Sequence, residues 1–164
     1  MGMVLVLRSV DENEVRSVAG DPSAFEEFLF GDEAYDNADE VDFDKGWHAL
    51  HHVFTGSSEP TDSPLNLFGV GEPVGEDGGY GPALLWPAQY THEFRDALAQ
   101  LTEDDLRKRF DLTKLVEDEV YLAKTFAEEG ADFAWEYVSQ SISALREFIE
   151  RCVVSGRTVL SVIS

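Results

Sequence analysis

The stretch MVLVLRSV, residues 3–10, decides the fold that this sequence predicts. Its valines and leucines form a short apolar run of the kind found in buried β-strands. A second such run, RTVLSVIS, occupies residues 157–164. We therefore expect the two terminal strands to be neighbours in a small mixed sheet, with several helices between them, which is an α+β arrangement.

Capping residues mark the helices that follow the first strand. Asp11 followed by Glu14 is typical of a helix start with a capping box. A second short helix is expected over residues 23–30. Asp44 is well placed to cap a third helix, which Gly56 ends, because glycine readily adopts the left-handed conformation that closes a helix.

The second half of the chain alternates loops with helices. Residues 56–82 are dense in glycine and proline, which favours a long irregular stretch. ALLW, residues 83–86, is strand-like, and Pro87 suits the first turn of a helix. Capped short helices are expected next, and the longest helix is predicted over residues 131–154 from its apolar spacing. Apolar residues recur there at Ala134, Val138, Ile142, Leu145, Phe148, Ile149 and Cys152.

Length and composition favour one compact domain over residues 1–164. The chain is 43% hydrophobic, which is enough for a core that needs neither a disulfide nor a metal. Its only cysteine, Cys152, excludes an intramolecular disulfide. No secretion signal or membrane-spanning run stands out, so we expect a cytoplasmic protein without a membrane partner.

The charge is strongly negative. The chain has 33 acidic and 12 basic residues, a net charge of -21. A phosphate backbone would be repelled at every approach, so nucleic acid is excluded as a partner. Much of the acidity lies in residues 11–44. A solvated acidic face explains it, and a docking surface for a basic protein is the alternative.

Three of the four histidines lie in WHALHHVFTG, residues 47–56. At helical spacing, Trp47 lies on the apolar face and His51 at its edge, while His48 and His52 project together from the polar flank as an exposed pair. The pair lacks the glutamate of an H-E-x-x-H motif, so we expect neither a metal nor another cofactor. A buried, hydrogen-bonded His51 is expected, with a catalytic role as the alternative.

The same helix carries a pattern that resembles a known family. It matches W-x-x-L-H-x-x-L-T-G, with phenylalanine in the last aliphatic place, at Trp47, Leu50, His51, Phe54, Thr55 and Gly56. The MGM start, GYGPALLWPAQ at residues 79–89 and LRKRFDLTKL at residues 106–115 also agree with the YfbM-like family. The resemblance covers nearly the whole chain and implies an α+β fold among bacterial proteins of unknown function. It also favours His51 over the neighbouring histidines.

The glycine-rich segment EDGGYGPA, residues 76–83, is the second candidate site. Its spacing is not that of a Walker loop or a dinucleotide-binding loop. It is either a turn that holds Tyr80 against the core or a cradle in which exposed amides receive a ligand. If this loop meets the histidine helix, a small-ligand pocket would be formed. Its residues would be Trp47, His51, Thr55, Tyr80 and Gly81.

Two classes of function remain. We prefer a non-enzymatic interaction module for a basic partner protein. The alternative is a small-ligand binder or a hydrolase-like enzyme that uses a crevice between the His51 helix and the Tyr80 loop. No serine has the context of a catalytic nucleophile and no carboxylate pair stands out, so the catalytic residues stay unknown. The sequence also leaves the oligomeric state open.

Overall fold

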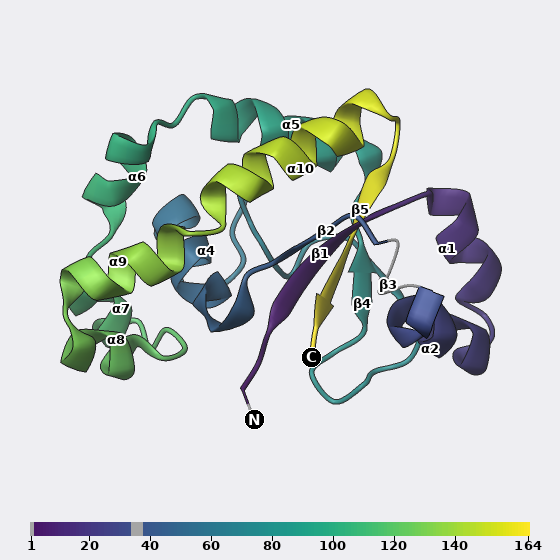
Figure 1. Cartoon of the computed structure of the whole chain (residues 1–164), viewed down its shortest axis with the longest axis horizontal. Helices are drawn as coiled ribbons and strands as arrows, with labels where there is room; N and C mark the ends of the chain where they lie inside the picture. Colours follow the sequence, from purple (N-terminus) through teal and green to yellow (C-terminus); the bar gives the residue numbers. More distant parts are fainter. Residues whose placement is uncertain (1, 34–37) are drawn as a thin grey trace.

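The computed structural model describes residues 2–33 and 38–164. Within these residues, one sheet has the strand order β2-β1-β5-β4-β3 (Figure 1). The strands are β1 (Leu5–Val10), β2 (Glu40–Asp42), β3 (Glu72–Val74), β4 (Ala83–Leu85) and β5 (Thr158–Ile163). The predicted α+β class is confirmed, and the terminal strands β1 and β5 are neighbours at the centre of the sheet.

The sheet is antiparallel throughout and not mixed as expected. β1 pairs with β5 from Leu5 opposite Ile163 to Val10 opposite Thr158, and the other three pairings are also antiparallel. Parallel neighbours require a crossover that returns the chain to the same end of the sheet. Here β3 and β4 are joined by the loop of residues 75–82, and the two terminal strands run in opposite directions, so no parallel pair arises (Figure 1).

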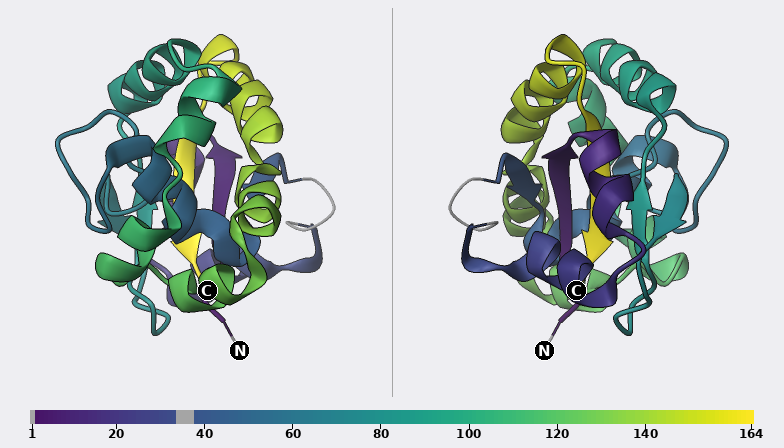
Figure 2. Two further views of the ribbon diagram at one scale, coloured as in Figure 1. Left: turned by 90° about the vertical axis from the view of Figure 1, so that its left-hand side faces the viewer. Right: turned by 90° about the vertical axis from the view of Figure 1, so that its right-hand side faces the viewer.

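Helices cover both faces of the sheet (Figures 1 and 2). α1 and α2 cover one face, and the helices from α4 to α10 gather over the other. The bounds are α1 (Glu12–Val18), α2 (Pro22–Phe30), the 3₁₀ turn η1 (Asp44–Gly46), α4 (Trp47–Thr55), α5 (Ala88–Ala99), α6 (Glu103–Arg109), α7 (Leu112–Glu117), α8 (Ala123–Glu129), α9 (Ala131–Ser139) and α10 (Ile142–Val154).

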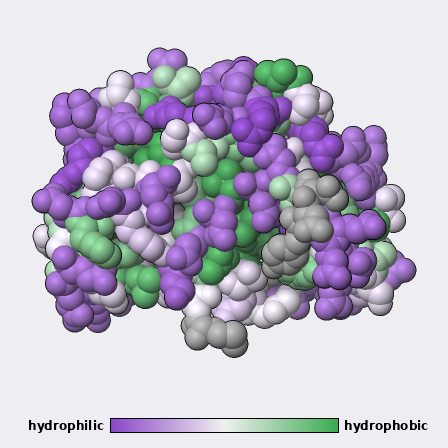
Figure 3. Space-filling model, viewed as in Figure 1, coloured by the Kyte–Doolittle hydropathy of each residue, from purple (hydrophilic) through white to green (hydrophobic). Residues whose placement is uncertain are grey.

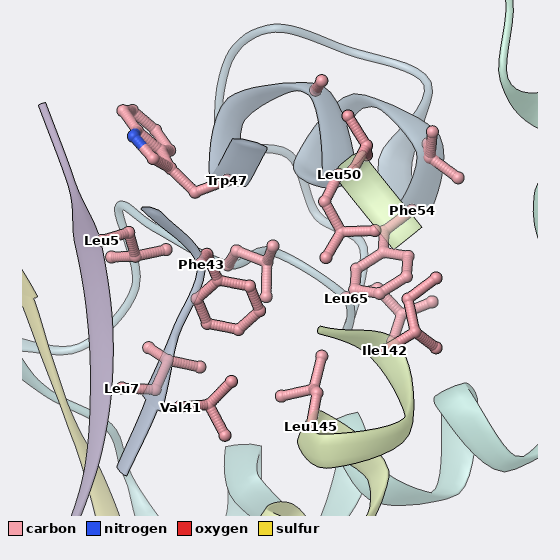
Figure 4. Close-up of a cluster of buried hydrophobic side chains, with 14 of the residues drawn as sticks. Leu5, Leu7, Val41, Phe43, Trp47, Leu50, Phe54, Leu65, Ile142 and Leu145 are labelled. Carbon is pink, nitrogen blue, oxygen red and sulfur yellow. The ribbon is translucent and has the colours of Figure 1, made fainter. Parts of the chain in front are cut away.

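Two hydrophobic cores follow from this layering. The larger core lies between the sheet and α4–α10, where Leu5 and Leu7 of β1 face Phe43 and the start of α10 (Figure 4). The smaller core lies under α1 and α2 and includes Phe25 and Leu29. Hydrophilic residues cover much of the face seen in Figure 3. The two helices α1 and α2 cover their side of the sheet only in part, which leaves cavities beside α2.

Most local cap predictions are confirmed. Asp11 accepts a hydrogen bond from the Glu14 amide at 3.0 Å, and Gly56 ends α4 with a φ of 76°. The expected cap at Asp44 is wrong. Asp44 begins a 3₁₀ turn, and its carboxylate accepts a hydrogen bond from the Tyr137 hydroxyl at 2.5 Å. The Asp44 carboxylate therefore binds a distant tyrosine and does not cap the amides of the helix.

The predicted long helix over residues 131–154 is broken. α9 ends at Ser139, and α10 begins at Ile142. The apolar residues Ala134, Val138 and Ile142 keep four-residue spacing across the break. This pattern predicts which side chains are buried, but it does not reveal that the helix is interrupted. Neither glycine nor proline marks the break. The longest described helix has 13 residues, and none in the described ranges has the length and apolar character needed to cross a bilayer.

Candidate functional site

His51 is a core residue that joins α4 to the loop after it. Its side chain is 0% exposed. Nε2 forms a hydrogen bond with the Glu59 carbonyl at 3.0 Å, and Nδ1 accepts one from the Leu67 amide at 3.3 Å. Burial lowers the pKa of His51 from 6.5 to about 4, because the charged ring would be desolvated. The ring is therefore neutral near pH 7, with both nitrogens engaged.

His48 and His52 do not form the exposed pair that the helical wheel predicts. His48 Nε2 contacts the Ser58 carbonyl at 2.7 Å, and its Nδ1 accepts a hydrogen bond from the Tyr121 amide at 3.0 Å. His52 is buried, with Nε2 2.7 Å from the Asp118 carboxylate. Distant segments therefore cover the flank that the sequence pattern leaves open. Burial also lowers the pKa of His48.

The other α4 candidates are also engaged within the fold. Trp47 is buried, and its Nε1 donates a hydrogen bond to the Met3 carbonyl at 3.1 Å. The Thr55 hydroxyl donates to the His51 carbonyl at 2.9 Å within the helix. In the described ranges, no three His, Cys, Asp or Glu side chains are grouped in a way that suits a metal ion. α4 therefore contributes packing and loop anchoring.

The predicted crevice between His51 and Tyr80 is not found. His51 lies in the core on the α4 side of the sheet, whereas Tyr80 lines a cavity beside α2, with the smaller core. The reason is a close contact at the start of the β3–β4 loop. Gly75 has a φ of +74°, and a Cβ at this position would overlap the Phe25 ring of α2. This contact holds the loop, and Tyr80 with it, beside α2.

Tyr80 and Gly81 line a cleft between α2 and the β3–β4 loop, which we call the α2 cleft. Its volume is about 420 Å³. Buried apolar residues form its floor, and exposed residues form its walls and rim. The floor includes Phe25, Leu29 and Ala83, the walls Phe30 and Tyr80, and the rim Glu26, Glu76 and Asp77. The structure thus brings together two of the five predicted site residues, and ligand binding by them stays a prediction.

Exposed aromatic rings are concentrated at the α2 cleft. Phe30 is 51% exposed and Tyr80 is 48% exposed. In the described part of the chain, the other exposed large hydrophobic side chains are Phe133 and Val154, and neither lines this cleft. Apolar surface that gathers in one place on a protein commonly marks an interaction site. Within the described residues, the α2 cleft is therefore the strongest candidate site.

The charge around the α2 cleft has one sign. Its described lining includes the carboxylates of Glu26, Glu76 and Asp77, and none of these lining residues is lysine, arginine or histidine. Asp77 Oδ1 accepts hydrogen bonds from the amides of Gly79 at 2.7 Å and Gly81 at 3.0 Å. Both glycines have positive φ angles, so the loop that presents Tyr80 depends on this acceptor and on glycine.

Sequence reasoning missed Phe30 and Glu26. The available signal was the angular position of Phe30 on its helix, since it lies away from the apolar face formed by Phe25 and Leu29. An aromatic ring on the polar side of a short helix has no partner within that helix. The structure shows that Phe30 and Tyr80 line the same cleft, next to the place where Gly75 approaches Phe25.

A larger cavity, of about 750 Å³, lies on the other side of α2. Several of its charged groups already have partners. Arg8 pairs with Glu40 at 3.2 Å, and Arg157 Nε donates to the Ser9 hydroxyl at 2.9 Å. Asp39 pairs with Arg151 at 2.8 Å. The half-exposed rings Phe30 and Tyr80 do not line it, so this cavity lacks the aromatic anchor that the α2 cleft offers to a partner.

Comparison with known proteins supports the family assignment. Residues 1–162 match the family model described as "Domain of unknown function (DUF1877)". The chain belongs to the DUF1877 family. The Escherichia coli (strain K12) protein YfbM is 32% identical to this DUF1877 chain over 127 residues, or 75% of each sequence. The YfbM-like resemblance is therefore confirmed.

The fold of this DUF1877 protein is also that of a solved structure. The crystal structure of YfbM from Escherichia coli, titled as a protein of unknown function, matches with a TM-score of 0.74. The match covers 98% of this chain and 99% of that one at 23% identity. These comparisons establish family and fold, and the function has to be argued from the α2 cleft.

Proposed function

We propose that this DUF1877 protein is a non-enzymatic binding module that docks a basic partner protein at the α2 cleft. One observation carries the proposal. Phe30 and Tyr80, each about half exposed, line one cleft whose described charged side chains are all acidic. Such a surface offers an apolar anchor point and selects for positive charge around it.

The rings supply a modest anchor. A fully buried aromatic side chain covers about 150–250 Å². Covering the exposed halves of Phe30 and Tyr80 would remove roughly 200 Å² from water, or about 5 kcal/mol at ~25 cal/mol per Å². The loss of translational and rotational freedom offsets a comparable amount. The anchor alone therefore supports only weak binding, and charge complementarity has to add to it.

The charge of the whole chain acts in the same direction. A net charge of -21 attracts basic proteins and repels acidic ones. Exposed charges are screened over roughly 8 Å at physiological ionic strength, so this attraction mainly raises the association rate at low salt. The aromatic contact is insensitive to salt by comparison. A partner bound in this way should lose affinity as salt rises, without losing all of it.

The enzyme alternative loses its main support. It places the titratable nitrogen of His51 beside Tyr80, and the structure separates these two residues. The described lining of the α2 cleft contains neither histidine nor cysteine. A small-ligand site at the cleft is still compatible with its volume, which is in the usual range of about 300–1,000 Å³.

Fluorescence anisotropy with labelled peptides tests the proposal. The probes are heptapeptides with one tryptophan and either two lysines or two glutamates. We expect the lysine peptide to bind the wild-type protein and the glutamate peptide not to bind. Tyr80→Ala and Phe30→Ala should each weaken lysine-peptide binding at least tenfold, since each removes half of the roughly 5 kcal/mol aromatic anchor and about 1.4 kcal/mol already corresponds to a factor of ten.

Phe133→Ala is the matched control, because Phe133 is equally exposed but lies on α9, away from the cleft. It should leave peptide binding unchanged. A similar loss in Phe133→Ala would show that the peptide binds exposed aromatic rings without regard to site, and would overturn the proposal. So would equal binding of the lysine and glutamate peptides.

A further inference from the structure

The size of the α2 cleft limits what can enter it. A volume of about 420 Å³ suits a drug-sized group, which corresponds to about one or two large side chains. A whole helix or domain face does not fit. The nearest sheet edge is also closed to an added strand, because β3 has only three residues and Pro73 lacks an amide hydrogen. The partner must therefore present a short linear segment.

The floor of the cleft selects an apolar anchor. Phe25 and Leu29 of α2 are buried beneath the opening, and Ala83 of β4 joins them. A cation placed against this floor would lose its hydration without a carboxylate beside it. A large aliphatic or aromatic side chain would instead be covered by the floor and by the Phe30 and Tyr80 rings.

The carboxylates stand on both sides of that anchor position. Glu26 belongs to α2, whereas Glu76 and Asp77 belong to the opposite loop. In the described structure, the side chains of Glu26 and Glu76 make no hydrogen bond or ion pair. A segment that crosses the cleft from wall to wall thus meets an unpaired carboxylate before and after its anchor.

We infer that the α2 cleft recognises a short linear segment in which one large apolar or aromatic side chain is flanked on both sides by lysine or arginine. The inference rests on the proposed function and names the docking segment of the basic partner. Extended chains return side chains to the same face every second residue. Basic residues two positions before and two positions after the anchor therefore point toward the two acidic walls.

A second copy of the chain is a poor occupant. Each copy carries a net charge of -21, so pairing of two clefts would bring their acidic rims together. A basic segment instead neutralises the rims. Charge complementarity therefore decides between the two occupants.

Three peptides of equal composition test the order of residues. Acetyl-GKSWSKG has the anchor between the lysines, whereas acetyl-GKKSWSG and acetyl-GSWSKKG have both lysines on one side. Each is labelled and titrated into the full chain by fluorescence anisotropy. We expect the flanked peptide to bind about threefold more tightly than either one-sided peptide, because only it can meet both walls and one exposed ion pair contributes about that factor.

Glu26→Gln and Glu76→Gln separate the two walls. Each should weaken the flanked peptide about threefold, in the range of exposed ion pairs. Glu128→Gln, at an exposed position on α8, is the matched control and should have no effect. Circular dichroism and thermal melting check the fold of each variant. We expect all three variants to be folded, because the replaced side chains are exposed.

The outcomes distinguish this inference from the proposed function. Equal affinity of all three lysine peptides, still lost in Tyr80→Ala, would overturn the flanking rule and leave a basic-partner site. Binding of N-acetyltryptophanamide as tight as that of the flanked peptide would show that flanking charges are not read, and would also overturn it. So would a dimer in sedimentation that Tyr80→Ala dissolves, since a second copy would then occupy the cleft.

Discussion

At the residue scale, the three clustered histidines act as anchors for distant segments. His48 binds the backbone at Ser58 and Tyr121, His51 binds it at Glu59 and Leu67, and His52 binds Asp118. An imidazole suits this task, because its neutral form offers one donor and one acceptor on a rigid ring. One helix thereby positions several irregular segments that have few regular hydrogen bonds of their own.

Replacement of His51 tests this anchoring role. His51→Ala should lower the free energy of unfolding by about 3 kcal/mol, because it leaves a cavity and strips partners from the Leu67 amide and the Glu59 carbonyl. His92→Ala is the control, since His92 is the one exposed histidine. Urea unfolding at pH 7 measures both. A His51→Ala effect no larger than that of His92→Ala would contradict the anchoring role.

His51→Ala also tests how the free energy of unfolding depends on pH. The pKa of His51 is lowered on folding from 6.5 to about 4, so below pH 6.5 the unfolded chain takes up a proton that the folded chain excludes. Stability is therefore lost as the pH falls through this window. The loss from His51 alone should reach about 2 kcal/mol at pH 5. The difference between wild type and His51→Ala should accordingly narrow by that amount between pH 7 and pH 5.

At the scale of elements, the ends of helices follow from local sequence signals, whereas contacts between distant segments do not. Asp11 and Gly56 act within one turn of their helices, so neighbouring residues suffice to predict them. The glycine-rich surroundings of Tyr80 mark it as a candidate, but they do not indicate that it lies beside α2 and not beside His51. The contact that decides its place, Gly75 on Phe25, joins residues 50 positions apart. No pattern within either segment carries that information.

Substitution at Gly75 tests how the loop is held. Gly75→Ala should destabilise the protein by about 2 kcal/mol and weaken peptide binding at the α2 cleft. The alanine Cβ would overlap the Phe25 ring, and the φ of +74° is unfavourable for any residue with a Cβ. Gly78→Ala in the same loop is the control, because a Cβ there meets open space. Equal melting temperatures of the two variants would show that the contact does not position the loop.

At the scale of the whole molecule, the fold was predictable because it is set by the two terminal strands and by one apolar face per helix. The candidate site was not, because it arises where α2 covers the sheet incompletely. Helix α2 packs Phe25 and Leu29 inward and leaves Phe30 beside an open cleft. A gap between elements depends on how they are placed in space, which periodicity does not specify.

The net charge gives the last prediction. The 12 basic residues can neutralise at most 12 of the 33 acidic ones, so 21 carboxylates keep no cation of their own. Their mutual repulsion raises the free energy of the compact state more than that of the expanded chain. Sodium chloride screens this repulsion, since the Debye length falls from about 30 Å at 0.01 M to about 8 Å at 0.15 M. The melting temperature should therefore rise over this range, while binding of the lysine peptide at the α2 cleft weakens. A melting temperature that stays flat or falls would show that ion pairs such as Arg8 with Glu40 outweigh the repulsion between the remaining carboxylates.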